Sequence, residues 1–116
     1  MNIEEIREYC LEKKAVTESF PFNETVLVFK VMNKMFLLSD LNKSGITLKN
    51  EPEKNIMLRE EFSDVIGAFH MNKQHWNTVE YKGKISMDLL KELIDESYSI
   101  IVKSLTKKKQ EEFEKL

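Results

Sequence analysis

The stretch from His70 to Lys84 gathers residue types that contact nucleic acid. It contains both histidines of the chain, its only tryptophan, Trp76, a single acid, Glu80, and the lysines Lys73, Lys82 and Lys84. Lysine and imidazole groups contact phosphate oxygens, and aromatic rings stack on bases or sugars. This composition predicts a binding surface. The alternative is that Trp76 fills the core while the lysines keep an edge strand soluble.

Residues suited to nucleophilic or redox chemistry are few. Cys10 is the only cysteine, and it falls on the apolar side of a predicted helix, where a buried thiol stays protonated and inert. The three glycines are too few to build a phosphate-cradling loop, a dinucleotide fingerprint or a glycine-flanked serine elbow. We therefore predict that the protein is not an enzyme and binds no cofactor.

Metal-ligating residues also lack the spacing of a site. His70 and His75 are five residues apart, which suits neither one face of a helix nor the usual zinc spacing. Glu4, Glu8 and Glu12 form an acidic row, but the basic residues between them would neutralise it. We expect a solvated helix face at this row and no bound metal.

Length and composition indicate one globular domain spanning residues 1–116. The chain is 41% hydrophobic and 33% charged, with a net charge of -2. That balance gives no global attraction to a polyanion, so nucleic-acid binding would need a local basic patch. The single cysteine predicts a reducing compartment, and the chain shows neither a signal peptide nor an apolar run of about 20 residues. We expect a cytoplasmic monomer that does not enter the membrane.

The hydrophobic pattern predicts three helices and four strands. The helices are expected at residues 2–14, from Pro52 through Val65, and from Ser86 to Leu105, with a frayed extension at 106–116. The strands are expected at 25–31, 35–39, 45–49 and 76–81, the first two forming a hairpin tipped by Asn33 and Lys34. Residues 66–75 show neither the periodicity of a helix nor that of a strand. Short connections among the first three strands predict an α+β fold, an antiparallel β-sheet with helices packed on one face.

Five sequence blocks, in order, resemble the MmcQ/YjbR family. The similarity extends from about Glu18 to Leu105, and its most specific part is the Asn-Lys-x-His-Trp-Asn block. The blocks are Glu18-Ser19-Phe20-Pro21-Phe22, then Val28-Phe29-Lys30-Val31 with Lys34-Met35-Phe36, then Leu58-Arg59-Glu60, then Met71-Asn72-Lys73-Gln74-His75-Trp76-Asn77-Thr78-Val79, and Asp95-Glu96-Ser97-Tyr98.

The resemblance implies a CyaY/frataxin-like fold and DNA binding through a double wing of two β-hairpins. On this chain the first wing would be residues 25–39, with Lys30 and Lys34, and the second would be the turn containing Lys82 and Lys84. Lys49, Lys73 and His75 would lie between the wings. The lysines would hold phosphates, while His75 and Trp76 contact sugar or base edges. Ser97 and Tyr98, on the inward face of the last helix, are expected to hydrogen-bond to the sheet in a structural role, with the Tyr98 hydroxyl satisfied locally.

A second interpretation keeps the same groove but changes the ligand. The protein would then be a non-enzymatic module for a protein or small ligand, with Trp76 as an aromatic anchor and His75 as a pH-sensitive contact. Iron binding, by analogy with the frataxin-like fold, would need a continuous acidic ridge, and the first helix is too mixed for that. A shared site requires Lys30, Lys34, Lys73, His75 and Trp76 to converge.

Overall fold

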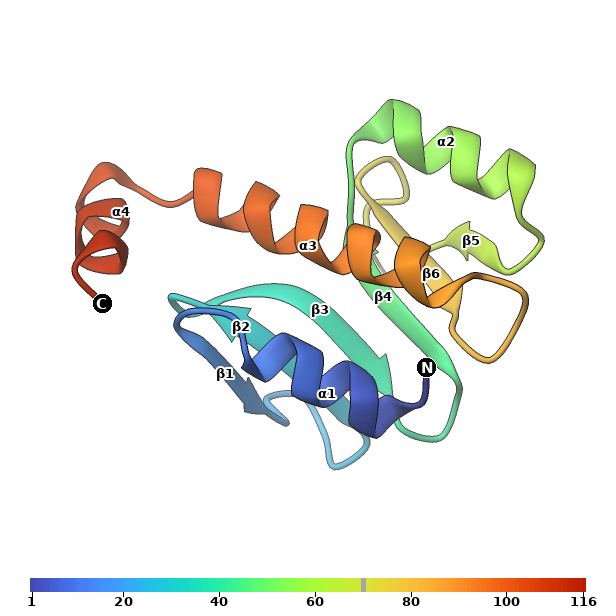
Figure 1. Ribbon diagram of the computed structural model, residues 1–116, viewed down its shortest axis with the longest axis horizontal. Coiled ribbons are helices and arrows are strands. Elements are labelled where there is room, and N and C mark those ends of the chain that lie inside the picture. The colour runs from blue at the N-terminus through green and yellow to red at the C-terminus, as the bar shows by residue number, and fades with distance from the viewer. Residues whose placement is uncertain (70) are drawn as a thin grey trace.

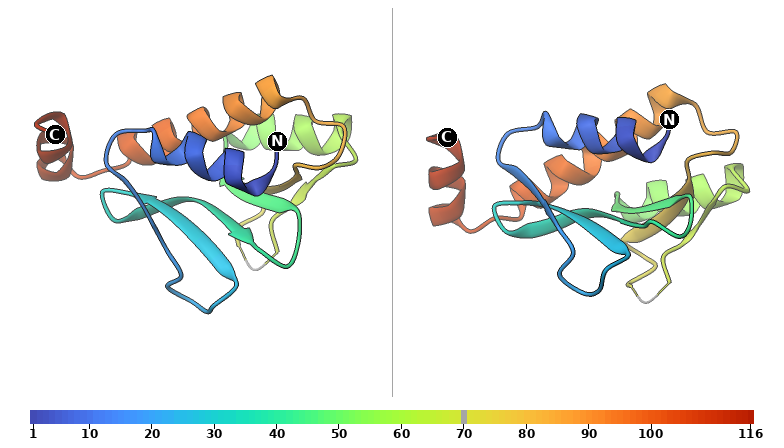
Figure 2. Two further views of the ribbon diagram at one scale, coloured as in Figure 1. Left: turned by 60° about the horizontal axis from the view of Figure 1, so that its bottom comes forward. Right: turned by 90° about the horizontal axis from the view of Figure 1, so that it is seen from below.

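One antiparallel β-sheet forms the body of the protein, and helices cover one of its faces (Figures 1 and 2). The computed structural model describes residues 1–69 and 71–116. In that part of the chain the strands lie in the order β1-β2-β3-β4-β6-β5, and every neighbouring pair is antiparallel. The predicted fold class is confirmed. The elements are α1 (Ile3–Leu11), β1 (Val16–Ser19), β2 (Val26–Val31), β3 (Lys34–Asp40), β4 (Gly45–Lys49), α2 (Pro52–Glu61), β5 (Val65–Gly67), β6 (Trp76–Glu80), α3 (Met87–Lys103) and α4 (Lys107–Glu114).

Helix α1 begins with the predicted capping box and ends earlier than predicted. The Asn2 side chain accepts a hydrogen bond from the Glu5 N–H at 2.8 Å, and the Glu5 carboxylate accepts from the Asn2 N–H. The helix ends at Leu11, and the chain then turns at Ala15, which has a φ of 63°. Strand β1 follows where no strand was predicted.

The β2–β3 hairpin turns one residue earlier than the sequence indicated. Val31 pairs with Lys34, so the two turn residues are Met32 and Asn33, with φ values of 48° and 67°. Two positive φ values are the geometry of the tight turns that match the twist of a hairpin. Lys34 is therefore the first residue of β3 and not part of the tip.

The second half of the chain adds elements that the pattern did not predict. Helix α2 ends at Glu61, and the three-residue strand β5 occupies the end of the predicted helix and the start of the stretch with neither period. Ser86 caps α3 as predicted, accepting from the Leu89 N–H at 3.1 Å. Helix α4, capped by Thr106, forms in the stretch where fraying was expected.

The core lies between the sheet and the helices. The sheet contributes alternate residues such as Leu27, Phe29 and Val31 to the core, and α3 contributes Leu90 and Ile94. The helices α1, α2 and α3 all lie on this side of the sheet (Figure 2).

Cys10 belongs to the same core, as predicted for a packed cysteine. Burial raises the pKa of its thiol to about 12, although the positive charge of Lys13 opposes part of the shift. The thiol therefore stays protonated at neutral pH.

Candidate functional site

The face of the sheet turned away from the helices carries the candidate site, and we call it the open face. Because Leu27 and Phe29 point into the core, alternation along β2 places Lys30 on the open face. On β4 and β6 the same rule places Thr47 and Thr78 there, and their hydroxyl oxygens lie 2.7 Å apart. Figure 2 shows that the helices leave this face uncovered.

An apolar hollow of about 350 Å³ lies on the open face. Two phenylalanines on loops stand at it: Phe22, between β1 and β2, is 68% exposed, and Phe69, between β5 and β6, is 75% exposed. Exposed apolar side chains gathered around a hollow mark interaction surfaces. The remaining lining residues are Val26, Met35, Leu38, Thr47 and Met71.

Strand register brings two predicted lysines and the tryptophan to one end of the open face. Lys49 pairs with Trp76, and Lys30 pairs with Met35 on the intervening strand β3. Since neighbouring strands lie about 4.8 Å apart, the Lys30 and Lys49 backbones are about 10 Å apart. We call this the hairpin end, because it contains the turn of the β2–β3 hairpin.

Lys73 lies on the β5–β6 loop at the β5 edge of the sheet, with its stem on the helix side, because Gly67 pairs with the inward-pointing Asn77. Its stem packs so closely on Gly67 that a Cβ at position 67 would lie 3.1 Å from Lys73 Cγ and Cδ. Its ammonium lies 5.8 Å from the centroid of the Phe69 ring. His75 is half-buried and directly precedes Trp76. Trp76 therefore lies on the open face at the hairpin end, whereas Lys73 lies at the neighbouring edge and alternation turns His75 toward the helix side.

A hydrogen-bond network fixes the loop that carries Lys73 and His75. The carbonyl oxygens of three successive residues, Lys73, Gln74 and His75, all accept hydrogen bonds from α2 or the segment before it. The donors are Arg59 Nη1 at 2.9 Å, Asn55 Nδ2 at 3.2 Å and the Asn50 backbone N–H at 3.2 Å. Because these three carbonyls are hydrogen-bonded, the backbone of residues 73–75 is held in one position relative to α2.

Asn77 completes this network from the core side of β6. It is fully buried, its Oδ1 accepts from Arg59 Nη1 at 2.7 Å, and its Nδ2 donates to the Asn55 carbonyl at 3.2 Å. At the start of the loop, the Asn72 side chain accepts from the Gln74 N–H at 2.8 Å. Loop geometry therefore accounts for the asparagines of the most specific sequence block.

Sequence reasoning missed the positioning roles of Arg59, Asn55 and Asn77. The available signal was polar side chains at positions where the pattern expects apolar ones. Asn77 lies two residues before the core residue Val79 on the same strand, and Asn55 lies three residues before the buried Leu58 on α2. Buried amides of this kind need hydrogen-bond partners. Asn55 donates to the Asn50 and Gln74 carbonyls, and Asn77 pairs with the Arg59 side chain and the Asn55 carbonyl.

Three predicted site lysines lie elsewhere. Lys34 points to the helix side, where its Nζ donates to Ser104 Oγ at 3.1 Å at the end of α3. Lys82 and Lys84 follow β6 at the opposite end of the sheet, and the Lys84 N–H donates to the Asp64 carboxylate at 2.7 Å. The two predicted wings therefore sit at opposite ends of the sheet and do not converge. The predicted convergence of Lys30, Lys34, Lys73, His75 and Trp76 is also wrong, because Lys34 lies on the opposite side of the sheet from Lys30 and Trp76.

The other predictions for this region have mixed outcomes. Trp76 does not fill the core: it is half-buried, and it is on the open face because its neighbour Asn77 points inward. His70 lies outside the described residues. The predictions that depend on it, the start of the His70–Lys84 segment and the His70–His75 spacing, therefore lie outside them too. Across residues 1–69 and 71–116, no three His, Cys, Asp or Glu side chains are placed to hold a metal ion.

Ser97 forms the predicted hydrogen bonds to the sheet, whereas the prediction of a local partner for the Tyr98 hydroxyl is wrong. Ser97 Oγ donates to the Phe36 carbonyl at 2.5 Å and accepts from the Lys49 N–H at 2.9 Å, which ties α3 to β3 and β4. The Tyr98 hydroxyl donates to the Lys14 carbonyl at 2.6 Å, in the turn after α1. Ser97 thus helps to position the backbone of Lys49.

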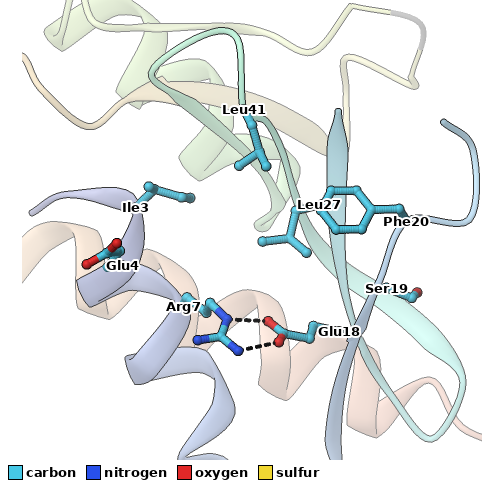
Figure 3. Close-up of a pocket in the computed structure, with 8 residues that line it drawn as sticks. All are labelled: Ile3, Glu4, Arg7, Glu18, Ser19, Phe20, Leu27 and Leu41. Carbon is cyan, nitrogen blue, oxygen red and sulfur yellow. Dashed lines mark hydrogen bonds and ion pairs between the residues drawn. The ribbon is translucent and has the colours of Figure 1, made fainter. Parts of the chain in front are cut away.

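A second hollow, of about 410 Å³, lies between α1 and the β1–β2 edge of the sheet (Figure 3). Ile3, Leu27 and Leu41 form its apolar wall, and Arg7 donates to the Glu18 carboxylate through Nε at 2.7 Å and Nη2 at 2.5 Å. These hydrogen bonds hold the pKa of Glu18 below its ordinary value. No predicted site residue lines this hollow, and the ion pair within it joins α1 to β1.

These features define an α+β domain with one sheet face covered by helices and the other open. Among the described helices, none has the length and apolar character needed to cross a membrane. The sequence model of the YjbR family matches residues 11–100. The chain belongs to the YjbR family.

Relatives and solved structures agree with this assignment. The chain is 33% identical over 109 residues to the uncharacterised protein YbdF of Escherichia coli O157:H7, covering 92% of this chain and 89% of YbdF. It is 31% identical to the uncharacterised protein YjbR of Escherichia coli K12, with 95% of each chain covered.

Two crystal structures have similar folds. The Deinococcus radiodurans protein DR2400, with the domain DUF419, gives a TM-score of 0.90 at 32% identity, over 97% of this chain and 87% of that one. A Pseudomonas syringae protein gives a TM-score of 0.75 at 26% identity, over 86% of this chain and 98% of that one.

Proposed function

We propose that this protein binds nucleic acid on the open face of its sheet. Lys30, Lys49 and Lys73 would hold backbone phosphates, and Trp76 with His75 would contact sugars or bases. The observation that carries the proposal is the strand register, which pairs Lys49 with Trp76, with Lys30 two strands away from Lys49 at the same end of the face. Lysines beside exposed aromatic rings are the combination that nucleic-acid surfaces use.

The distribution of charge on the open face supports the same proposal. The chain carries a net charge of -2, but the two lysines on the strands of this face, Lys30 and Lys49, lie at the hairpin end. Alternation places two acids on the described strands of this face, Asp40 and Glu80, and both lie at the opposite end. Glu80 there accepts hydrogen bonds from the Ser44 hydroxyl and the Lys82 N–H. A polyanion therefore meets a locally positive surface at the hairpin end.

Salt dependence tests the role of these lysines. If Lys30, Lys49 and Lys73 each contact one phosphate, the logarithm of affinity should fall with the logarithm of salt concentration at a slope of about -2 on a single strand or about -2.7 on a duplex. The triple variant Lys30→Ala/Lys49→Ala/Lys73→Ala should lose most of this slope. Fluorescence anisotropy of a labelled oligonucleotide, titrated at several salt concentrations, measures both quantities.

The chain offers a control matched in charge. The variant Lys34→Ala/Lys82→Ala/Lys84→Ala removes the same number of lysines at sites away from the hairpin end of the open face. It should keep the affinity and the slope of the unmodified protein. Equal losses in the two triple variants, or no binding by the unmodified protein at low salt, would contradict the proposal.

The hollow gives the ligand-binding interpretation a specific basis. Its volume of about 350 Å³ falls within the range of small-molecule pockets, and its lining is largely apolar. A neutral ligand seated there would bind independently of salt and of the three lysines. The same titration therefore separates the two functions.

A further inference from the structure

We infer that the nucleic acid bound is single-stranded, with unpaired bases seated in the hollow of the open face. This inference rests on the proposed function and specifies its substrate class. Three observations carry it: the position of the lysines relative to the rims of the face, the aromatic rings at the hollow, and the lack of an element suited to a duplex groove at the hairpin end within residues 1–69 and 71–116.

The lysines lie on strands between protruding loops. Lys30 and Lys49 are half-buried on β2 and β4, inside the sheet. Figure 2 shows the β1–β2 loop and the described parts of the β5–β6 loop, on either side of residue 70, extending beyond the sheet on the side away from the helices. A stiff duplex resting on these loops would be held away from the strands. A flexible single strand can enter between them and bring its phosphates to both lysines.

No described element at the hairpin end is suited to reading a duplex. Direct reading of the major groove requires an α-helix or a two-stranded ribbon that enters it. The helices α1, α2 and α3 cover the opposite face of the sheet. The β2–β3 hairpin is a ribbon, but the lysine that begins its second strand, Lys34, is hydrogen-bonded to Ser104 on the helix side.

The aromatic rings at the hollow suit unpaired bases. Phe22 and Phe69 expose most of their surface, and Lys73 places its ammonium close to the Phe69 ring. The repeating unit of a single strand is a nucleotide, with a base that can stack on an aromatic ring and a phosphate that can bind a cation beside that ring. A base paired inside a duplex cannot offer its face to such a ring.

The charges favour an anionic occupant over a neutral one. Lys30 and Lys49 take no part in the ion pairs recorded within residues 1–69 and 71–116. A neutral peptide or a second copy of the sheet face would cover these partly buried ammonium groups without neutralising them, which is costly. A phosphate backbone supplies the missing negative charge.

The test compares one oligonucleotide in two forms. An oligothymidylate of about twelve nucleotides, within the usual range of site sizes, is titrated alone and as a duplex with its complement. Because Trp76 is the only tryptophan, its fluorescence reports directly on the open face. We expect the single strand to bind at least tenfold more tightly than the duplex and to quench Trp76.

Aromatic variants distinguish base stacking from charge attraction. Phe22→Ala with Phe69→Ala should weaken single-strand binding by roughly 5- to 150-fold, the effect of losing one stacked base, and leave duplex binding unchanged. Phe20→Ala, in the second hollow, is the control and should have no effect. Both substituted rings are exposed, so folding should be retained.

Each other outcome has a defined meaning. Duplex binding equal to or tighter than single-strand binding would overturn the inference and leave the proposed function standing. Equal binding of inorganic polyphosphate of the same charge would also overturn it, because the bases would then contribute nothing. Binding of neither nucleic-acid form at low salt would contradict the proposed function itself.

Discussion

Asn77→Leu is expected to lower the free energy of unfolding by about 2–4 kcal/mol, because it leaves buried hydrogen-bonding groups without partners. The leucine side chain has the same number and branching of heavy atoms as that of asparagine, so the main loss is of hydrogen bonds. The Arg59 guanidinium loses its acceptor at 2.7 Å, and the Asn55 carbonyl loses its donor at 3.2 Å. Chemical denaturation followed by circular dichroism measures the change.

Two further variants determine whether the network causes this loss. Asn72→Ala changes an exposed asparagine that makes a local hydrogen bond to the Gln74 N–H, and it should cost less than about 1 kcal/mol. In Asn77→Leu/Arg59→Met both partners are apolar. The decrease in the free energy of unfolding of this double variant should be about 0.5–3 kcal/mol smaller than the sum of the decreases in the two single variants. Strict additivity would show that the two side chains do not interact.

Ser97→Ala is expected to lower the free energy of unfolding by about 2–4 kcal/mol, because the Ser97 hydroxyl is hydrogen-bonded to two buried backbone groups. Ser97 is fully buried, and its Oγ bridges the Phe36 carbonyl at 2.5 Å and the Lys49 N–H at 2.9 Å. Its loss would leave both groups unpaired between α3 and the sheet. Denaturant unfolding measures the cost, with Ser99→Ala on the same helix as the control.

Hydrogen exchange gives Ser97→Ala a local signature. The Lys49 amide hydrogen should exchange faster in this variant, whereas the Lys30 amide, on a strand that Ser97 does not contact through these bonds, should be unaffected. A general increase in exchange across the sheet, with no excess at Lys49, would contradict the bridging role.

The elements predicted correctly are those whose signals are local. Asn2 and Ser86 cap their helices through their own side chains, and the β-branched run of β2 needs no distant information. Strands β1 and β5 have four and three residues at the two edges of the sheet. Strands this short have too few residues to show a two-residue alternation, so periodicity could not reveal them.

A one-residue error in the hairpin explains the misplacement of Lys34. Successive strand residues alternate between faces, so a shift of one residue reverses the face of every side chain. The turn at Met32 and Asn33 pairs Lys34 with the core residue Val31 and directs it to the helix side. Lys30, four residues earlier, lies on the open face.

The rest of the candidate site depended on long-range geometry. The sequence block from Asn72 to Asn77 drew attention to Lys73, His75 and Trp76, but not to Arg59, which holds the loop from α2. Nor does local pattern place Lys82 and Lys84 at the far end of the sheet, because that depends on the direction of β6. These positions follow from strand order, which the sequence pattern does not encode locally.

Chemical-shift mapping by NMR tests most directly whether the open face binds unpaired nucleic acid. Titration with the oligothymidylate should shift the Trp76 indole N–H and the amides of Lys30, Lys49 and Thr78, and leave Arg7 and Glu18 in the second hollow unchanged. Shifts confined to Lys34 and the Lys82–Lys84 turn, or to the second hollow, would contradict binding at the open face, as would an unchanged spectrum.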